Sequence, residues 1–305
     1  MPDSSPAPRA DFRAERAAHA ACARLATSHY ENFPVRAPFL RSAERRDLAA
    51  VDAFCRTTDD LGDEAPGDRA ALLAAWREEL AAALGGGAPA APVLVALART
   101  VRERDLGADL FFRLVEANLR DQTVREYADR AALLDYCEHS ATPVGRMVLG
   151  VAGARGEDLG RMADHTSIGL QLANFWQDLA RDRNQGRCYL PLADCRRHGV
   201  DPAADLGGPV AAPALRALLA DEVAWAREHL LRGWPLADRL PIRWRPLVRS
   251  FSRGGWAICD AIERQGFDTL SRRPVLPRRE RARLLFAELA RAWRTGLPHP
   301  GRRWS

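Results

Sequence analysis

The stretch that decides the fold class is residues 171–191, which read QLANFWQDLARDRNQGRCYLP. Asn174, Asp178 and Asp182 follow one another at intervals of four residues, so on a helix they form a single polar stripe. Apolar side chains fill the faces beside this stripe, and neither glycine nor proline interrupts it. The pattern predicts one helix over 157–183 that carries two carboxylates and an amide on one face.

A second acidic stretch, DAFCRTTDDLGDE, covers residues 52–64. Asp59 and Asp63 lie four residues apart, and Arg56 shares their helix face. Like charges at this spacing destabilise a bare helix, whereas Mg²⁺ takes one or two carboxylates together with phosphate oxygens. Acidic runs on helices are usually solvated faces with nearby arginine partners. Two such clusters, both flanked by apolar residues, instead favour a metal-assisted site that ionises an allylic diphosphate.

Composition extends the helical prediction to the whole chain of 305 residues. Ala, Leu, Arg and Glu dominate the composition. These residues are strong helix formers, so an all-β protein is not expected. The hydrophobic fraction of 47% with a net charge of only +5 excludes a disordered chain. We therefore expect one helical domain over residues 10–295, between a disordered tail (1–9) and a basic tail (296–305). Apolar periodicity predicts helices near 10–28, 43–64, 68–84, 93–103, 108–120, 129–138, 143–153, 157–183, 211–231, 241–269 and 279–295.

Positive charge is concentrated at the C-terminus, where residues 271–305 hold ten arginines and two glutamates. The rest of the chain lacks a basic stripe with interleaved aromatic residues, so no nucleic-acid partner is expected. Two interpretations of the basic C-terminal helix remain open, namely contact with an anionic membrane surface or packing on the body with a solvated arginine face. The six cysteines lack metal-ligand spacing, and the N-terminus lacks an apolar signal segment. Both features predict a cytoplasmic protein. If the C-terminal helix contacts membrane, the protein is expected at the inner face of that membrane.

These motifs together resemble the squalene/phytoene synthase family over roughly residues 25–290. The family has a DxxxD motif, here Asp59 to Asp63, and an N-x3-D-x3-D motif followed by G-R-x-Y-x-P, here Asn174 to Pro191. A tyrosine-containing helix lies between them, here around Tyr136. The resemblance implies an all-α isoprenoid synthase helical bundle with a central cavity, Mg²⁺ as cofactor and a prenyl diphosphate as substrate.

Within the family, residues 29–35, 140–146 and 174–178 are most similar to the hopanoid-pathway branch that makes hydroxysqualene from presqualene diphosphate. In the implied reaction the diphosphate ionises, the cyclopropane ring opens and water captures the cation. NADPH is not expected, and no glycine-rich dinucleotide fingerprint is present. The chain departs from the wider family pattern at positions that the resemblance places around the diphosphate site. These departures are Tyr30, Asn32, Asp52 and Gln177.

Two other functions remain open. One is condensation of two prenyl diphosphates, as in presqualene diphosphate, squalene or phytoene synthases. The other is a non-catalytic assembly factor of the same fold, although such proteins tend to lose the carboxylates that this chain keeps. A head-to-tail prenyltransferase would lack the Gly186 to Pro191 element.

The resemblance assigns a role to each candidate site residue, and each has a plain structural alternative. The carboxylates are expected to bind Mg²⁺, and Asn174 to bind the metal or the diphosphate unless it is a buried structural amide. The arginines are expected to clamp diphosphate unless each pairs with a neighbouring aspartate, and Tyr136 to steer the diphosphate or a cation unless it is an ordinary half-buried tyrosine. Further aromatic residues either line the cavity or belong to the core. The metal ligands are Asp59, Asp63, Asn174, Asp178 and Asp182; the catalytic residues are Tyr136, Arg56 and Arg187; the substrate-binding residues are Arg56, Gln171, Asn174, Arg187, Tyr189 and Phe33; the further aromatic candidates are Phe54, Phe111, Phe112, Phe175, Trp176 and Trp256.

Overall fold

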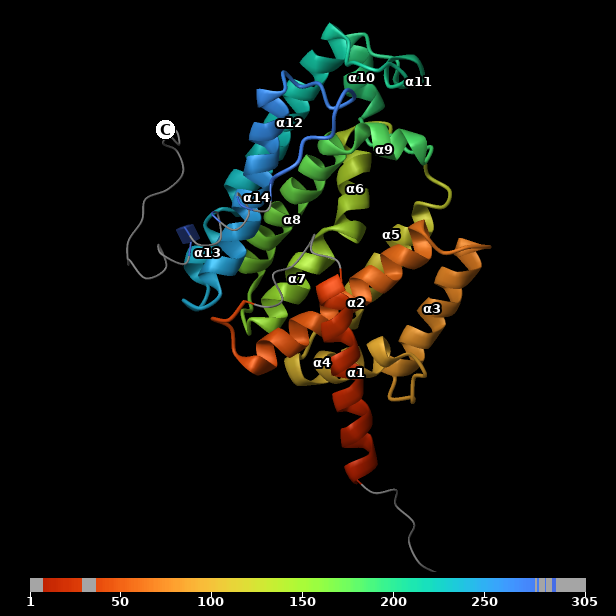
Figure 1. Cartoon of the computed structure of the whole chain (residues 1–305), viewed down its shortest axis with the longest axis vertical. Helices are drawn as coiled ribbons and strands as arrows, with labels where there is room; N and C mark the ends of the chain where they lie inside the picture. The colour runs from red at the N-terminus through yellow and green to blue at the C-terminus, as the bar shows by residue number, and fades with distance from the viewer. Residues whose placement is uncertain (1–7, 29–36, 278, 280–282, 284–286, 289–305) are drawn as a thin grey trace, which may run out of the picture. The chain divides into compact units, whose positions relative to one another are not determined.

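The structure is a computed structural model that describes residues 8–28, 37–277, 279, 283, 287 and 288. About 71% of it is helical and the described residues contain no β-strand, which confirms the all-α prediction (Figure 1). The chain divides into two compact units. Unit 1 is residues 1–122 with 150–153, and unit 2 is residues 123–149 with 154–305. The single domain over 10–295 stays a prediction. Some predictions fall wholly or largely outside the described residues, namely the 1–9 tail, Tyr30, Asn32, Phe33, the helix over 279–295 and the 296–305 tail.

Unit 1 is built mainly from helices whose ends follow local signals. Asp68 begins one helix, because its carboxylate accepts a hydrogen bond from the backbone N–H of Ala71 at 3.0 Å. The uncharged stretch 80–98 contains a helix end, a glycine-rich loop and a helix start at Pro92, as its breakers predict. The helices are α1 (Pro8–Ser28), α2 (Ser42–Asp63), α3 (Arg69–Leu84), α4 (Pro92–Arg104) and α5 (Ala108–Arg120).

Three aromatic side chains form the centre of unit 1. The ring of Phe54 on α2 stacks on Trp76 of α3, with 6.0 Å between centroids, and meets Phe111 of α5 edge-on at 5.4 Å. The buried indole N–H of Trp76 donates to Thr58 Oγ1 at 3.0 Å. These contacts fix α2 between α3 and α5, so they position the acidic end of α2.

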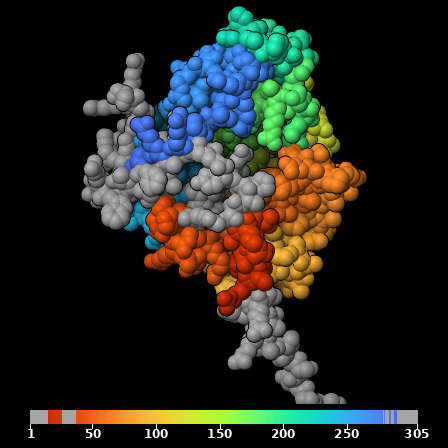
Figure 2. Space-filling model, viewed as in Figure 1, coloured from red at the N-terminus to blue at the C-terminus, as the bar shows by residue number. Residues whose placement is uncertain are grey.

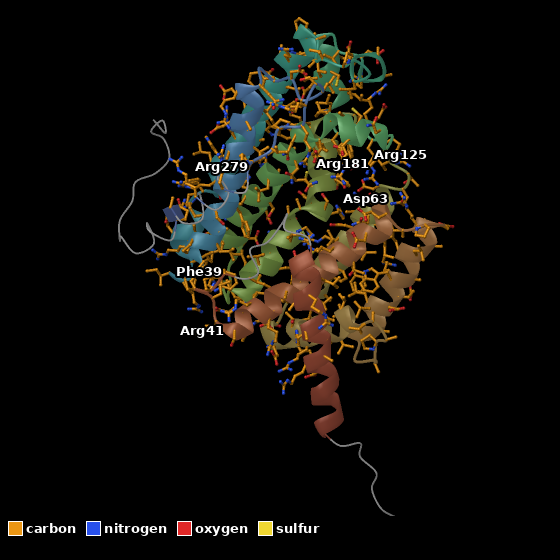
Figure 3. The ribbon with its side chains drawn as sticks, in the orientation of Figure 1. Phe39, Arg41, Asp63, Arg125, Arg181 and Arg279 are labelled. Carbon is orange, nitrogen blue, oxygen red and sulfur yellow. The ribbon has the colours of Figure 1, made fainter. Side chains whose placement is uncertain are left out.

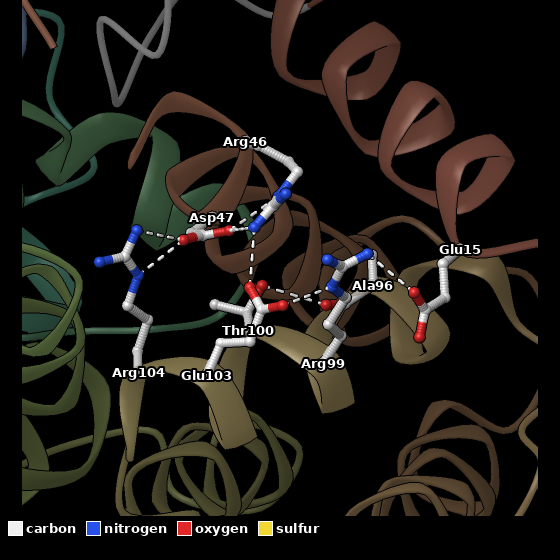
Figure 4. Close-up of polar contacts among 8 residues, drawn as sticks. All are labelled: Glu15, Arg46, Asp47, Ala96, Arg99, Thr100, Glu103 and Arg104. Atoms are coloured by element: carbon white, nitrogen blue, oxygen red, sulfur yellow. Dashed lines mark hydrogen bonds and ion pairs between the residues drawn. The ribbon is translucent and has the colours of Figure 1, made fainter. Parts of the chain in front are cut away.

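A network of ion pairs joins α1, α2 and α4 (Figure 4). Asp47 on α2 is fully buried, and Arg104 of α4 donates to its carboxylate at 2.7 Å. Arg99, also on α4, donates to Glu15 of α1 at 2.7 Å and to Glu103 at 2.8 Å. Because a buried carboxylate is costly without a partner, this network requires α4 to stay aligned with α2.

Unit 2 contains most of the remaining helices, and here two helix predictions need correction. The helix expected over 157–183 ends at Gln177 and restarts at Leu179, and the one expected over 241–269 covers only Arg245–Arg264. Three short helices, α10, α11 and α13, were not expected. None of the helices in the described part of the chain combines the length and apolar composition that a bilayer crossing needs. The helices are α6 (Arg130–Ser140), α7 (Thr142–Val151, whose last two residues belong to unit 1), α8 (Glu157–Gln177), α9 (Leu179–Asn184), α10 (Leu192–His198), α11 (Pro202–Asp205), α12 (Pro213–Gly233), α13 (Leu236–Arg239) and α14 (Arg245–Arg264).

Glycines allow α8 and α12 to pack closely in unit 2. A Cβ atom on Gly233 of α12 would lie 2.2 Å from Thr166 Oγ1 of α8. A Cβ atom on Gly169 of α8 would lie 2.8 Å from Leu230 Cγ of α12. Both distances are too short for real carbon contacts, so any larger residue would force the two helices apart. α14 packs against both helices and completes this three-helix core.

All six cysteines are buried, and the structure, which describes each of them, contains no disulfide between them. Burial raises the pKa of Cys22 in unit 1 to about 11, and it does the same for Cys188 in unit 2. These thiols are therefore protonated and unreactive near neutral pH.

A buried pair of carboxyl groups links α10 and α12 in unit 2. Arg130 donates to Asp194 at 2.7 Å and to the fully buried Glu222 at 3.1 Å, and its guanidinium lies 4.6 Å from the ring centroid of Trp225. Burial raises the pKa of Glu222 to about 8, Arg130 opposes this rise, and a hydrogen bond shared with Asp194 adds to it. The protonated form of Glu222 is therefore favoured near neutral pH, whereas Arg130 and the other neighbours of Asp194 lower the pKa of that carboxyl group.

We predict that Glu222 makes the protein less stable as pH rises. Its pKa is higher in the folded state than the ordinary value of 4.5, so its contribution is complete below about pH 4.5 and is lost as pH approaches 8. Glu222→Gln mimics the protonated form, and we expect it to remove ~1 kcal/mol or more of the pH dependence measured by urea unfolding between pH 5 and 8.5. Glu228→Gln, on the exposed face of the same helix, is the control. Equal pH slopes for wild type and Glu222→Gln would contradict this account.

Candidate active site

The acidic end of α2 is held by the last turn of α5 in unit 1. Asn118 Nδ2 donates to Asp59 Oδ1 at 3.2 Å and to the backbone oxygen of Leu114 at 3.1 Å. Gln122 Nε2 donates to the backbone oxygen of Gly62 at 3.1 Å. Asp63, labelled in Figure 3, is the last residue of α2. The structure thus places Asp59 and Asp63 on one helix end, as predicted, and adds two amides that sequence reasoning missed, namely Asn118 on α5 and Gln122 just after it.

Gly62 makes this close approach of α2 and α5 possible. A Cβ atom at this position would lie 2.6 Å from Asn118 Oδ1 and 3.5 Å from Asn118 Cβ. Asn118 is buried, so its amide has little room to move away. The glycine between the two aspartates is therefore required for the hydrogen bond that orients Asp59.

Asp52, which lies four residues before Arg56 on α2, orients the Arg56 side chain. Arg56 Nε donates to Asp52 Oδ2 at 2.9 Å, and the carboxylate of Asp52 is almost fully buried. Burial raises the pKa of Asp52, and the charge and hydrogen bond of Arg56 oppose that rise. The structural alternative to diphosphate binding is that Arg56 pairs with a neighbouring aspartate. The Nε atom of Arg56 makes this pairing.

Asp59 is exposed at the end of α2, and its carboxylate lies among other acidic side chains. Protein atoms crowd around it, and the resulting loss of hydration raises its pKa to about 7. The hydrogen bond from Asn118 lowers the pKa, while the negative charges of Asp63, Asp60 and Asp121 raise it further. This end of α2 therefore has an excess of negative charge that a cation would relieve.

In unit 2 the polar stripe lies across the junction of α8 and α9. Asp178 leaves helical geometry, with φ −104° and ψ 13°, but the hydrogen-bond ladder continues around it. Its N–H donates to the carbonyl of Asn174 at 2.9 Å, and its own carbonyl accepts from the N–H of Asp182 at 2.9 Å. The four-residue spacing is therefore kept although the helix is interrupted.

The residues around this junction differ in exposure. Asn174 is exposed on α8, Gln171 is half-buried one turn earlier, and Asp178 and Asp182 are half-buried. Asn174 is therefore not the buried structural amide of the plain alternative. Gln177 is buried, and its Nε2 donates to the backbone oxygen of Pro274. Arg181 is exposed on α9 (Figure 3).

Four aromatic rings pack together behind the junction. Phe175 of α8 stacks on Tyr189, with 3.9 Å between centroids and 11° between planes. Tyr136 of α6 lies 5.7 Å from Tyr189 and 6.2 Å from Phe175, and Tyr127 stacks on Tyr189 at 5.7 Å. Tyr136 is buried in this cluster, and Phe175 is therefore part of a packed aromatic group.

Backbone hydrogen bonds hold the GRCYLP segment in place. The N–H of Cys188 donates to the carbonyl of Arg125 at 2.8 Å, and the N–H of Leu192 donates to the carbonyl of Tyr127 at 2.9 Å. The N–H of Arg187 donates to the carbonyl of Asp182 at 2.9 Å, and Arg187 itself is buried. The motif is thus fixed at one end to α9 and along its length to the segment before α6.

Other aromatic and histidine residues have structural partners. Phe54 and Phe111 belong to the core of unit 1, as their plain alternative states. His165 of α8 has no second histidine close to it at metal-ligand spacing in the sequence, but folding brings His229 of α12 to 3.2 Å from it, Nδ1 to Nδ1. Burial, together with the neighbouring His165, lowers the pKa of His229 to about 4, so this imidazole is neutral at pH 7.

The donor set of both stripes fits Mg²⁺. It consists of carboxylate and amide oxygens, which are ligands of hard cations, and contains neither thiolate nor imidazole. Within the described residues, no three His, Cys, Asp or Glu side chains gather as a complete metal site. This is compatible with Mg²⁺, which commonly takes one or two carboxylates and completes its shell with water and phosphate oxygens.

Comparison with known proteins identifies the class to which this all-helical fold and these motifs belong. A sequence model of squalene/phytoene synthase matches residues 26–280. The chain therefore belongs to the squalene/phytoene synthase family and is an enzyme of the isoprenoid synthase type.

Individual relatives refine this comparison. The crystal structure of squalene synthase HpnC from Alicyclobacillus acidocaldarius is 40% identical, covers 83% of this chain and 95% of its own, and has a TM-score of 0.78. Hydroxysqualene synthase of Zymomonas mobilis is 36% identical over 58% of this chain and 60% of its own length. Presqualene diphosphate synthase of the same organism is 30% identical over 71% of this chain and 78% of its own length.

We predict that Gly62→Ala disturbs the acidic end of α2. The added methyl group collides with the buried amide of Asn118, so we expect a loss of ~1–3 kcal/mol in the free energy of unfolding, measured by urea denaturation. Gly254→Ala is the matched control, because a Cβ atom at this helical position in α14 meets nothing within 4 Å. The control should be neutral or slightly more stable than wild type. A Gly62→Ala protein as stable as wild type would contradict the close packing described here.

Proposed function

We propose that this enzyme ionises presqualene diphosphate with the help of Mg²⁺, opens the cyclopropane ring and lets water capture the carbocation, which gives hydroxysqualene in hopanoid biosynthesis. The supporting observation is the pattern of identities. Identity to the hydroxysqualene synthase of Zymomonas mobilis is 36% over 58% of this chain, against 30% over 71% of it for the presqualene diphosphate synthase of the same organism. The same order holds for the two enzymes of Rhodopseudomonas palustris.

In unit 1, the end of α2 would bind metal and diphosphate. Asp59 and Asp63 would hold Mg²⁺, with Asn118 orienting the carboxylate of Asp59. Arg56 would donate its terminal N–H groups to diphosphate oxygens while its Nε remains bonded to Asp52. Ionisation of Asp59 is required for this role, and a bound cation favours the ionised form.

In unit 2, the α8–α9 junction would provide the second set of ligands. Asn174, Asp178 and Asp182 would hold Mg²⁺, and the bound ions neutralise the charge that develops on the departing diphosphate. Arg187 would donate to diphosphate oxygens. Gln171, one turn before Asn174, would contact the substrate together with Phe33, which lies outside the described residues. Tyr136 would steer the diphosphate or the carbocation, and Tyr189, stacked on Phe175 and Tyr127, would contribute to substrate binding from the same aromatic cluster.

The direct test is product analysis by mass spectrometry. Purified protein with Mg²⁺ and without NADPH is incubated separately with presqualene diphosphate and with farnesyl diphosphate. We expect hydroxysqualene from presqualene diphosphate and no product from farnesyl diphosphate. Consumption of farnesyl diphosphate would instead assign the chain to the condensing enzymes of the family, and no turnover of either substrate would favour the non-catalytic assembly factor.

Substitution of one aspartate in each stripe tests the site itself. We expect Asp59→Asn and Asp178→Asn each to lower kcat by about 100-fold or more, because each removes a charged ligand that acts on the departing diphosphate. Asp60→Asn is the control for α2, since Asp60 is an exposed neighbour with no role in the proposed site. Circular dichroism should show unchanged helix content for all three variants. Full activity of Asp178→Asn would contradict a metal-binding role for the stripe in unit 2.

A further inference from the structure

The segment that follows α14, residues 265–277 (the C-terminal strap), is tied to the α8–α9 junction by two adjacent contacts. Gln177 Nε2 donates to the backbone oxygen of Pro274. Arg273 donates from Nε to one carboxylate oxygen of Asp178 and from Nη2 to the other, the latter at 3.0 Å. In Figure 1 the blue chain after α14 turns back beside α8. Two consecutive residues of the junction thus hold two consecutive residues of the strap.

The strap is itself well anchored. Gln265 Nε2 donates to the backbone oxygens of Asp268 at 2.8 Å and Arg272 at 2.7 Å. The carboxylate of Asp268 accepts from the N–H of Ala211 at 2.9 Å. In the space-filling view, the blue surface of α14 and the strap adjoins the green surface of this end of unit 2 (Figure 2). Arg273 therefore extends from a fixed backbone, and Pro274 beside it is buried.

Arg273 occupies the oxygens that a metal ion would need. The side chain of Asp178 is only 16% exposed, and both of its oxygens accept from one planar guanidinium. Bidentate pairs of this kind are among the stronger hydrogen-bonded ion pairs in proteins. A cation that binds Asp178 therefore competes with the positive charge of Arg273, and a guanidinium that it displaces needs another anionic acceptor.

We propose that Arg273 is an internal counter-ion that competes with Mg²⁺ for Asp178, so that the metal binds this motif tightly only together with a diphosphate. The diphosphate oxygens provide the anionic acceptor for the displaced guanidinium. Gln177 is a positioning residue in this device, because its bond to Pro274 holds the strap on the junction. The inference rests on the proposed function for its two ligands, and it adds a coupling between them. Linkage makes the coupling reciprocal, so each ligand strengthens binding of the other.

Calorimetric titration of the full-length protein tests this coupling without turnover. MgCl₂ is titrated alone and in the presence of inorganic pyrophosphate. For Arg273→Gln we expect the Kd for Mg²⁺ alone to fall about fivefold or more, and the strengthening of Mg²⁺ binding by pyrophosphate to shrink by a similar factor. Gln177→Ala should change both values in the same direction and by less.

Two further variants control for charge and folding. Arg272→Gln removes the same charge from the neighbouring, exposed arginine and should leave both affinities unchanged. Arg273→Lys keeps the charge but loses the planar fork, so we expect values between those of wild type and Arg273→Gln. If Arg273→Gln does not fold, the lysine variant decides the question by the same measurement.

The outcomes separate this inference from the proposed function. The counter-ion role is overturned if Arg273→Gln has an unchanged or weaker affinity for Mg²⁺, or if Arg272→Gln has an equal effect. Hydroxysqualene formation by the same preparation would still support the proposed function. The expected coupling in a protein that does not convert presqualene diphosphate supports the counter-ion and contradicts the proposed function. A wild-type protein that binds neither Mg²⁺ nor pyrophosphate overturns both.

Discussion

The close packing of α8 against α12 is the constraint on which unit 2 depends. Gly169 and Gly233 leave no room for a side chain at the crossing, and α6, α9, α13 and α14 also contact α8. This helix carries Gln171 and Asn174 and ends next to Asp178, so the polar stripe is presented from the most constrained element of the unit. Catalytic groups on such an element stay in register better than groups on a loop, which suits a site that must place charge accurately.

Much of the helical layout could be predicted because its signals are local. Proline, glycine and capping aspartates act on the backbone immediately beside them, and α5 was predicted with its observed limits. The acidic spacing of Asp59 and Asp63 is local in the same way. The assignment of the family followed from three motifs in order, and the match over 26–280 confirmed it. Roles of individual residues in the reaction stay predictions.

Features that depend on distant partners could not be predicted. The interruption of the helix at Asp178 coincides with contacts from Arg273 and Pro274, about 95 residues later in the chain, and apolar periodicity carries no information about such contacts. The hold of Asn118 on Asp59 crosses 59 residues, and the His165–His229 contact crosses 64. In each case the residue type was visible in the sequence and its partner was not.

The buried cysteines have a consequence for how the protein opens. A protected thiol reacts with a maleimide or disulfide reagent only when its surroundings unfold, so labelling rates report on local opening. Cys22 and Cys55 lie in unit 1, whereas Cys137, Cys188, Cys195 and Cys259 lie in unit 2. The native chain thus carries separate reporters in each unit. Matching exposure rates across the six thiols would mark the units as one cooperative body, and two distinct rates would mark them as independent ones.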